Sequence, residues 1–273
     1  MLNVLILIIA GCVGGFLTGF VGIGGNTIFV PVLDFILRDL GVQGDGLVKS
    51  IIANSLFITI FTGGIVSLKQ YRIGNFFPRE VAYIAVSGII SAWFVTYLIK
   101  QGSWYSREKF NLVFTIMLIP LILKLYLDKK DRTSEDKNIQ ASWLICIGLG
   151  VGVITSFSGL GGGIVMIPLL TDGFKLNIKK AASISTGVVP FFAASVCFSY
   201  MLENPDLTYA GFFRIGYVDF LFAIPLAVGA YLLSPVGVKV AQKSNQKTIR
   251  FTFATVLAVL LTKMLYELFI VSS

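Results

Sequence analysis

The sequence contains no histidine and little charge of either sign. Only 13% of its 273 residues are Asp, Glu, Lys or Arg, about half the share found in a typical soluble domain. Without imidazole the chain lacks the commonest metal ligand and the usual proton carrier of neutral pH. The apolar segments also hold no nucleophile–base pair and no metal-binding cluster. We therefore expect that the protein is not an enzyme and that it binds no metal ion and no cofactor.

Cysteine is scarce as well, and the positive charge is dispersed. Cys12, Cys146 and Cys197 lie inside apolar segments, where thiols act as small hydrophobic side chains rather than as a disulfide framework. The formal net charge is +8, but the cations are spread over short loops. This distribution argues against a nucleic-acid partner and is typical of a chain oriented in a membrane.

Long, nearly uncharged runs are abundant instead. Hydrophobic residues make up 56% of the chain, and runs of about 20 residues fit the core of a bilayer. Beyond the first 37 residues, such runs cover residues 51–68, 81–99, 110–123, 143–157, 181–202, 217–233 and 251–262. None alternates apolar with polar positions, as a barrel strand would. The sequence predicts an all-α polytopic membrane protein that lies in the lipid bilayer.

The chain also repeats itself at an offset of 137 positions. Residues 11–33 read GCVGGFLTGFVGIGGNTIFVPVL, and residues 148–170 read GLGVGVITSFSGLGGGIVMIPLL. Further matches follow in the same order: Asn54-Ser55 with Ser185-Thr186, and Arg72-Ile73-Gly74 with Arg214-Ile215-Gly216. Several matches in one order indicate an internal duplication.

The duplication defines two transmembrane repeats. We expect the first over residues 1–127, a polar linker over residues 128–140 and the second repeat over residues 141–273, with five helical segments in each repeat. The second segment of each repeat, 27–37 and 164–171, is too short to cross a bilayer. If the first two segments form a re-entrant hairpin, or if all five cross, the repeats are inverted. If the first two join into one broken span, the repeats are parallel.

Cations indicate the orientation. Fourteen fall on the side of the linker: Lys69, Arg72, Arg79, Lys129, Lys130, Arg132, Lys137, Lys175, Lys179, Lys180, Lys239, Lys243, Lys247 and Arg250. Six fall on the other side: Arg38, Lys49, Lys100, Arg107, Lys109 and Arg214. The positive-inside rule therefore predicts a multi-pass protein of the cell membrane with a cytoplasmic linker and both termini outside.

Closely spaced glycines interrupt the repeated segments. They are Gly22, Gly24 and Gly25 in the first repeat, and Gly159, Gly161, Gly162 and Gly163 in the second. Non-helical backbone is tolerated at membrane depth only inside protein or beside a cavity. Two such breaks in corresponding positions point to a midplane binding site, where new helix N-termini favour an anion. The alternative is close helix packing, which we expect for Gly11, Gly15, Gly148 and Gly152.

Small polar residues accompany both breaks. They are Asn26, Thr27, Asn54 and Ser55 in the first repeat, and Ser156, Ser158, Ser185 and Thr186 in the second. Neutral amide and hydroxyl donors can hold anionic oxygens without a buried cation. Alternatively, these groups bond between helices or to carbonyls of their own helix. Ionisable side chains that could couple transport to an ion are Asp34, Asp219, Lys263 and Glu267.

These motifs resemble the TauE/SafE family of sulfite and organosulfonate exporters over nearly the whole chain. The resemblance rests on GFVGIGGNTIFVPVL, SFSGLGGGIVMIPLL, the polar pairs and GYVD (residues 216–219). The first copy departs from the family at Asn26, where glycine is usual, and at Asn75, where aspartate is frequent. The resemblance implies export of a small sulfur-containing anion. An anion channel, or a transporter of another small organic anion such as a carboxylate, remains the alternative, and a homodimer remains open.

Overall fold

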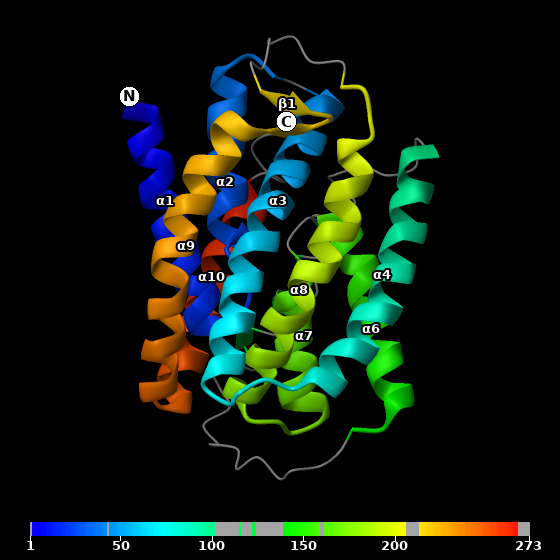
Figure 1. The fold of residues 1–273 in the computed structure, drawn as a ribbon, viewed down its shortest axis with the longest axis vertical. Helices are drawn as coiled ribbons and strands as arrows, with labels where there is room; N and C mark the ends of the chain where they lie inside the picture. Colours follow the sequence, from blue (N-terminus) through cyan, green and yellow to red (C-terminus); the bar gives the residue numbers. More distant parts are fainter. Residues whose placement is uncertain are drawn as a thin grey trace.

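The computed structural model describes residues 2–42, 44–101, 115, 119, 122–123, 139–158, 161–205 and 213–266. Most of the expected linker and of the 110–123 run lie outside these residues. Helices dominate the described part (Figure 1). They are α1 (Leu2–Val21), α2 (Asn26–Asp39), α3 (Gly44–Arg72), α4 (Pro78–Gln101), α6 (Ala141–Ser158), α7 (Gly163–Pro168), the π-helical η1 (Leu169–Gly173), α8 (Ile178–Met201), α9 (Phe220–Lys243) and α10 (Gln246–Tyr266).

Two short antiparallel strands complete the described elements. Strand β1 (Arg214–Ile215) pairs with β2 (Val218–Asp219) in a small hairpin that leads directly into α9. Five of the described helices, α1, α3, α4, α8 and α9, are long and apolar enough to cross a bilayer. Many large apolar side chains face outward, including Trp93 and Phe94 on α4, as they do in a protein surrounded by lipid tails. The expected class, an all-α polytopic membrane protein, is confirmed.

Helices α1 and α2 form a hairpin rather than one broken span. The ring of Phe29 on α2 lies against Gly14 on α1, where an added Cβ would be only 2.3 Å from Phe29 Cε1. Further along, the first turns of α1 (Val4 to Leu7) line a cavity together with the last turns of α2 (Val32 to Leu40). Helix α2 therefore runs back along α1. In the second half, the rings of Trp143 near the start of α6 and Phe174 after η1 are 6.0 Å apart, which indicates a similar return.

The two central helices, α3 and α8, pack against each other in opposite directions. Lys49 near the start of α3 is paired with Glu203 beyond the end of α8, at 3.2 Å. Ser67 near the end of α3 donates to the carbonyl of Thr186 in the first half of α8, at 2.8 Å. In Figure 1, α1 starts at the upper end of the bundle and α6 at the lower end. These directions are those that inverted repeats would give, although the duplication itself stays a prediction.

Each outer helix packs against a helix from the other half of the sequence, and small residues form these contacts. An added Cβ on Gly11 of α1 would lie 2.3 Å from the carbonyl oxygen of Leu226 on α9, and one on Gly15 would lie 2.5 Å from Ala230 Cα. Helix α6 packs on α4 in the same way, with Gly148 against Ile84 and Gly152 against Gly88. These four glycines thus pack helix on helix, as the sequence predicts for them, because a side chain would separate the backbones.

We expect Gly148→Ala to destabilise the protein, because its methyl group would lie 2.5 Å from the carbonyl oxygen of Ile84. Overpacking of this kind costs roughly 1–3 kcal/mol. Gly150→Ala on the same helix is the matched control, since nothing lies within 4 Å of its added Cβ. Thermal unfolding in detergent should show a lower Tm for Gly148→Ala alone. Equal Tm values for the two variants would contradict the close packing of α4 and α6.

Candidate functional site

The two glycine breaks meet inside the bundle. Gly22 and Gly24 in the first break have φ values of +87° and +82°, and Gly161 and Gly162 in the second both have +73°. These left-handed conformations favour glycine and allow the chain to reverse without a side chain. An added Cβ on Gly163 would lie 2.9 Å from the carbonyl oxygen of Ile23. The second break therefore packs directly against the backbone of the first.

The point where they meet also brings Asn26 next to Gly161. Asn26, the first residue of α2, is completely buried. Its Oδ1 accepts a hydrogen bond from the hydroxyl of Thr59 on α3. An added Cβ on Gly161 would lie 3.6 Å from Asn26 Nδ2 and 3.1 Å from Cγ1 of Val189 on α8. Thr59 and Val189 lie about half-way along α3 and α8, so both breaks meet at mid-height. We call Asn26, Thr59, Gly161 and Val189 the crossing site.

Two helices start at this point. Gly25 precedes α2 and Gly162 precedes α7, and neither start is capped by a side-chain hydrogen bond. Helix α7 continues into η1, so this apolar helix extends from Gly163 to Gly173. The first turn of a helix presents N–H groups and the positive end of its dipole. The crossing site therefore combines positive electrostatic potential with the amide of Asn26, without a buried Lys or Arg among its four residues.

The predicted second-half pair, Ser185 and Thr186, is divided between two roles. Ser185 donates to the carbonyl of Gly22 at 2.9 Å, which fastens α8 to the first break. Thr186 donates to carbonyls of its own helix, Ala182 at 3.0 Å or Ser183 at 3.1 Å. Ser55 behaves like Thr186, with its hydroxyl 3.1 Å from the carbonyl of Ile52. Only Ser185 of these three therefore bonds to a glycine break.

Asn54 holds the β-hairpin. Its Nδ2 donates to the carbonyls of Ser50 at 2.8 Å and Tyr217 at 3.0 Å, and its Oδ1 accepts from the backbone N–H of Asp219 at 2.9 Å. Both amide hydrogens are therefore occupied by backbone carbonyls. The matching Arg-Ile-Gly turn in the first half is held similarly, because the hydroxyl of Ser183 donates to the carbonyl of Asn75. In this structure Asn54 bonds the hairpin and not the crossing site.

Some of the predicted residues are only partly described. Gly159 and the side chains of Thr27 and Ser158 lie outside the described residues. Gly162 belongs to the second break, but an added Cβ there would point at α6, 2.4 Å from Cγ1 of Val151 and 2.6 Å from Thr155 Oγ1. Ser156 donates to the carbonyl of Ala92 at 2.9 Å and thus joins α6 to α4. Anion binding by any residue of the predicted set stays a prediction.

Thr59 is a site residue that the sequence interpretation missed. It follows Ser55 by four residues and precedes Thr62 by three, which places the three hydroxyls on one face of α3. All three side chains are buried. A search for small polar residues at helical spacing, continued beyond Asn54 and Ser55, would have found this face.

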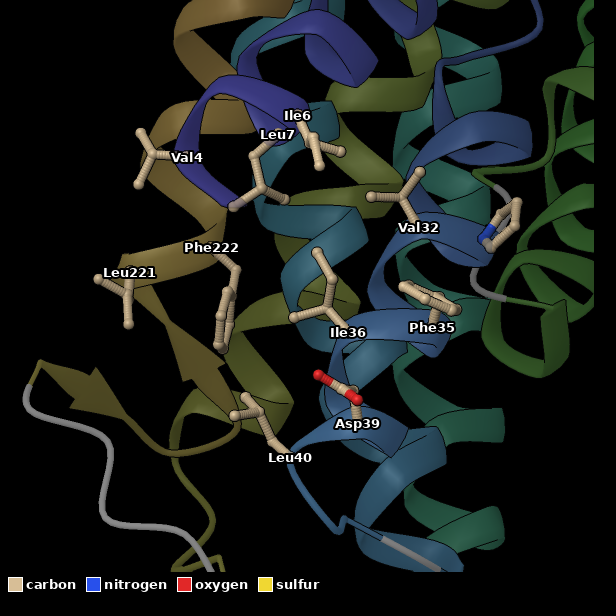
Figure 2. A pocket seen from close by; sticks show the side chains of 11 residues that line it. Val4, Ile6, Leu7, Val32, Phe35, Ile36, Asp39, Leu40, Leu221 and Phe222 are labelled. Carbon is tan, nitrogen blue, oxygen red and sulfur yellow. The ribbon is translucent and has the colours of Figure 1, made fainter. Parts of the chain in front are cut away.

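A separate cavity of about 450 Å³ lies between α1, α2 and α9 (Figure 2). Its lining is almost wholly apolar, including Leu7, Ile36 and Phe222, with Asp39 at one edge. None of the predicted site residues lines it. An apolar wall with one carboxylate offers an anion no donor and some repulsion, so the crossing site remains the better candidate.

The ionisable residues singled out by the sequence occupy different environments. Asp34 is paired with Arg38 one turn along α2, at 3.0 Å. Asp219 is completely buried where β2 leads into α9. The side chain of Lys263 and the whole of Glu267 lie outside the described residues. Of the four, Asp219 alone is shown to be a fully buried carboxylate.

Comparison with known proteins extends these observations. The family model for the sulfite exporter TauE/SafE matches residues 7–264. A probable membrane transporter protein of Methanocaldococcus jannaschii is 30% identical over 259 residues, which cover 93% of this chain and 92% of that protein. A probable membrane transporter protein of Haemophilus influenzae is 24% identical, covering 96% of this chain and 97% of that protein. A third relative, YunE of Bacillus subtilis, carries the same description and is 25% identical, covering 97% and 98%.

No solved structure matches the chain significantly. The match to the family model extends across both halves and includes both glycine breaks, the polar pairs and the β-hairpin. This chain therefore belongs to the sulfite exporter TauE/SafE family.

Proposed function

We propose that the protein is a membrane transporter that exports a small sulfur-containing anion, such as sulfite or an organosulfonate, and binds it at the crossing site. The observation that carries this proposal is the meeting of two backbone breaks about half-way along α3 and α8. Broken helices that meet at mid-height are the usual substrate sites of transporters built from repeats. The family name supports the sulfur-containing substrate.

Electrostatics favours an anion at this position. Each helix N-terminus carries roughly half a unit of positive charge, so the starts of α2 and α7 together supply about one unit. The effect is greater where water is excluded, and Asn26 and Thr59 are both completely buried. The amide of Asn26 adds a neutral donor beside the second break. Sulfite and sulfonate oxygens accept hydrogen bonds from such groups without a compensating buried cation.

Burial favours alternating access over an open channel. Ile23, Asn26, Thr59 and Ser185 are at most 1% exposed. An anion can therefore reach the crossing site only after the surrounding helices move. A transporter opens its site to one side at a time, whereas a conducting channel must expose it to both sides at once.

We also propose that the linker is cytoplasmic and both termini are outside. The structure gathers described cations at the end of the bundle where α3 and α9 finish and α4, α8 and α10 begin; they include Lys69, Arg72, Arg79, Lys179, Lys180, Lys243, Lys247 and Arg250. Lys179 there donates to the carbonyl of Gln242, which joins two of these helix ends. Such an accumulation of cations is typical of a cytoplasmic face.

Cysteine labelling tests this orientation in a background without the three native cysteines. Tyr71→Cys lies at the end of the bundle that carries these cations and Leu202→Cys at the opposite end, and the parent side chains are 67% and 71% exposed. We expect an impermeant maleimide to label Leu202→Cys in intact cells and Tyr71→Cys only after permeabilisation. The reverse pattern would show that the proposed orientation is wrong.

Uptake into proteoliposomes tests the function. We would compare labelled sulfite, thiosulfate, sulfoacetate, taurine and lactate in parallel, with protein-free liposomes as the control. We expect saturable uptake of at least one sulfur-containing anion, accelerated by unlabelled anion inside the vesicles. Flux that does not saturate and is not accelerated from the opposite side would favour the channel, and uptake of lactate alone would favour a carboxylate transporter.

A further inference from the structure

Asp219 has an unsatisfied buried carboxylate oxygen. The residue ends β2 and caps α9, and its side chain is 0% exposed. One oxygen, Oδ1, accepts the backbone N–H of Leu221 at 2.9 Å. The other, Oδ2, has no hydrogen-bond partner among the described residues. Buried polar atoms without a partner are costly and uncommon in native proteins, so Oδ2 requires an explanation beyond helix capping.

The charged groups near Asp219 are engaged elsewhere or not paired with it. Lys49 on α3 binds Glu203 at 3.2 Å and lies 5.4 Å from the ring centre of Tyr217. Arg214 stands opposite Asp219 in the β-ladder, but no ion pair joins the two within the described part of the chain. The ring of Tyr200 on α8 packs edge-on against Tyr217, and the first turn of α9 has no acid.

A second buried oxygen without a partner lies close by in the hydrogen-bond network. The hydroxyl of Ser50 on α3 has none among the described residues. Asn54 connects the two, because its Nδ2 binds the carbonyl of Ser50 and its Oδ1 binds the backbone N–H of Asp219. Asp219 is therefore part of a buried polar cluster on α3 and the hairpin. In this cluster, one carboxylate oxygen and one hydroxyl have no hydrogen-bond partner among the described residues.

This cluster is attached to the helix that lines the crossing site. Thr59 follows Asn54 by five positions, which is roughly 7.5 Å along a helix. Thr59 donates either to the carbonyl of Ser55 at 2.8 Å or to Oδ1 of Asn26. Asp219 and the crossing site are therefore connected through one short stretch of α3.

We propose that Asp219 takes up, on Oδ2, the proton that couples anion transport to the pH gradient; this rests on the proposed transport function. The proton binds the carboxylate from one side of the membrane to give a neutral carboxyl group. It is released when the cluster opens to the opposite side of the membrane. A carboxylate and an anion in the same low-dielectric interior repel each other. Each therefore binds more tightly when the other charge is neutralised, and this reciprocity makes the proton and the anion travel together in either direction. Export then follows the outward gradient of the anion and carries the proton out with it.

Proteoliposomes containing the full chain test the proposal with labelled thiosulfate, which stays fully ionised near neutral pH. The membrane potential is held at zero with valinomycin and equal potassium on both sides. With an alkaline interior and an acidic exterior, we expect the parent protein to accumulate thiosulfate at least fivefold above the outside concentration. For Asp219→Asn, which retains a capping oxygen and the side-chain shape, we expect no accumulation but exchange of inside for outside thiosulfate at equal pH.

Asp34→Asn is the matched control, since that acid is already paired with Arg38, and we expect accumulation to be unchanged. Accumulation by Asp219→Asn, no pH effect in the parent, or accumulation toward the acidic side would each overturn the proposal. Loss of exchange in a folded Asp219→Asn would overturn it as well. If that variant does not fold, Asp219→Ser, also a capping residue, replaces it under the same criteria. If the parent exchanges none of the anions compared above, the proposed function fails instead.

Discussion

Gly161→Ala is expected to lower anion transport at least tenfold. Its methyl group would lie 3.1 Å from Cγ1 of Val189 and 3.6 Å from Asn26 Nδ2, within the space that we assign to the anion. The alanine would also have to adopt a φ near +73°, which costs roughly 1–2 kcal/mol for an L-residue. Initial rates of uptake into proteoliposomes, together with anion titrations of the purified protein, measure the effect.

Gly74→Ala is the matched control for this backbone strain. Gly74 has φ +71°, and nothing lies within 4 Å of its added Cβ. The two variants should therefore lose similar stability, while only Gly161→Ala loses transport. If both variants transport at the parent rate, or both lose transport to the same degree, the crossing site is not where the anion binds.

Asn26→Asp is expected to weaken anion binding by two to three orders of magnitude. The substitution keeps the shape of the side chain and the oxygen that accepts from Thr59, but it adds a negative charge at the crossing site. Two like charges about 4 Å apart repel by about 4 kcal/mol at an effective dielectric constant of 20, which corresponds to roughly a thousandfold in affinity. The position at the start of α2 stabilises the new carboxylate, so the protein should still fold.

Asn177→Asp serves as the control for Asn26→Asp. Asn177 caps the start of α8 and accepts from the backbone N–H of Lys179 at 2.9 Å. Asn177→Asp therefore adds the same negative charge at a helix N-terminus, but outside the crossing site. Isothermal titration with the anion identified by uptake should give the parent affinity for Asn177→Asp only. If Asn26→Asp binds the anion with the affinity of the parent protein, the anion does not bind at the crossing site.

The features that depend on local pattern could be predicted from the sequence. Long, nearly uncharged runs require helices in a bilayer, so the fold class followed directly. The repeated Gly-x-Gly-Gly motifs marked the two breaks, whereas the doublets Gly14-Gly15 and Gly63-Gly64 stay inside α1 and α3. Gly11 and Gly148 could be predicted as packing residues because each is followed four positions later by a second glycine, Gly15 or Gly152, on the same helix face. Of the three arrangements that the sequence left open for the first two segments, the contact between Phe29 and Gly14 excludes the single broken span.

The partners of individual polar groups could not be predicted. Asn54 and Ser185 looked equivalent in the repeat, but one bonds the β-hairpin and the other the backbone of Gly22. An amide can donate to a ligand or to a carbonyl, and only the tertiary structure decides which is closer. Likewise, nothing in the run from Gly161 to Gly163 shows that Gly161 faces Asn26 while Gly162 faces α6. These directions depend on backbone torsion angles, which the residue types alone do not determine.

The packing of the outer helices limits how the molecule can move. Gly11 and Gly15 hold α1 against α9, and Gly148 and Gly152 hold α6 against α4, with backbones too close to slide apart without loss of contact. Each of these pairs takes one helix from each half of the sequence. A rocking motion that preserves both contacts must therefore carry α1 with α9 as one rigid body and α4 with α6 as another. As long as these contacts persist, each moving unit contains helices of both halves, and neither half rotates by itself.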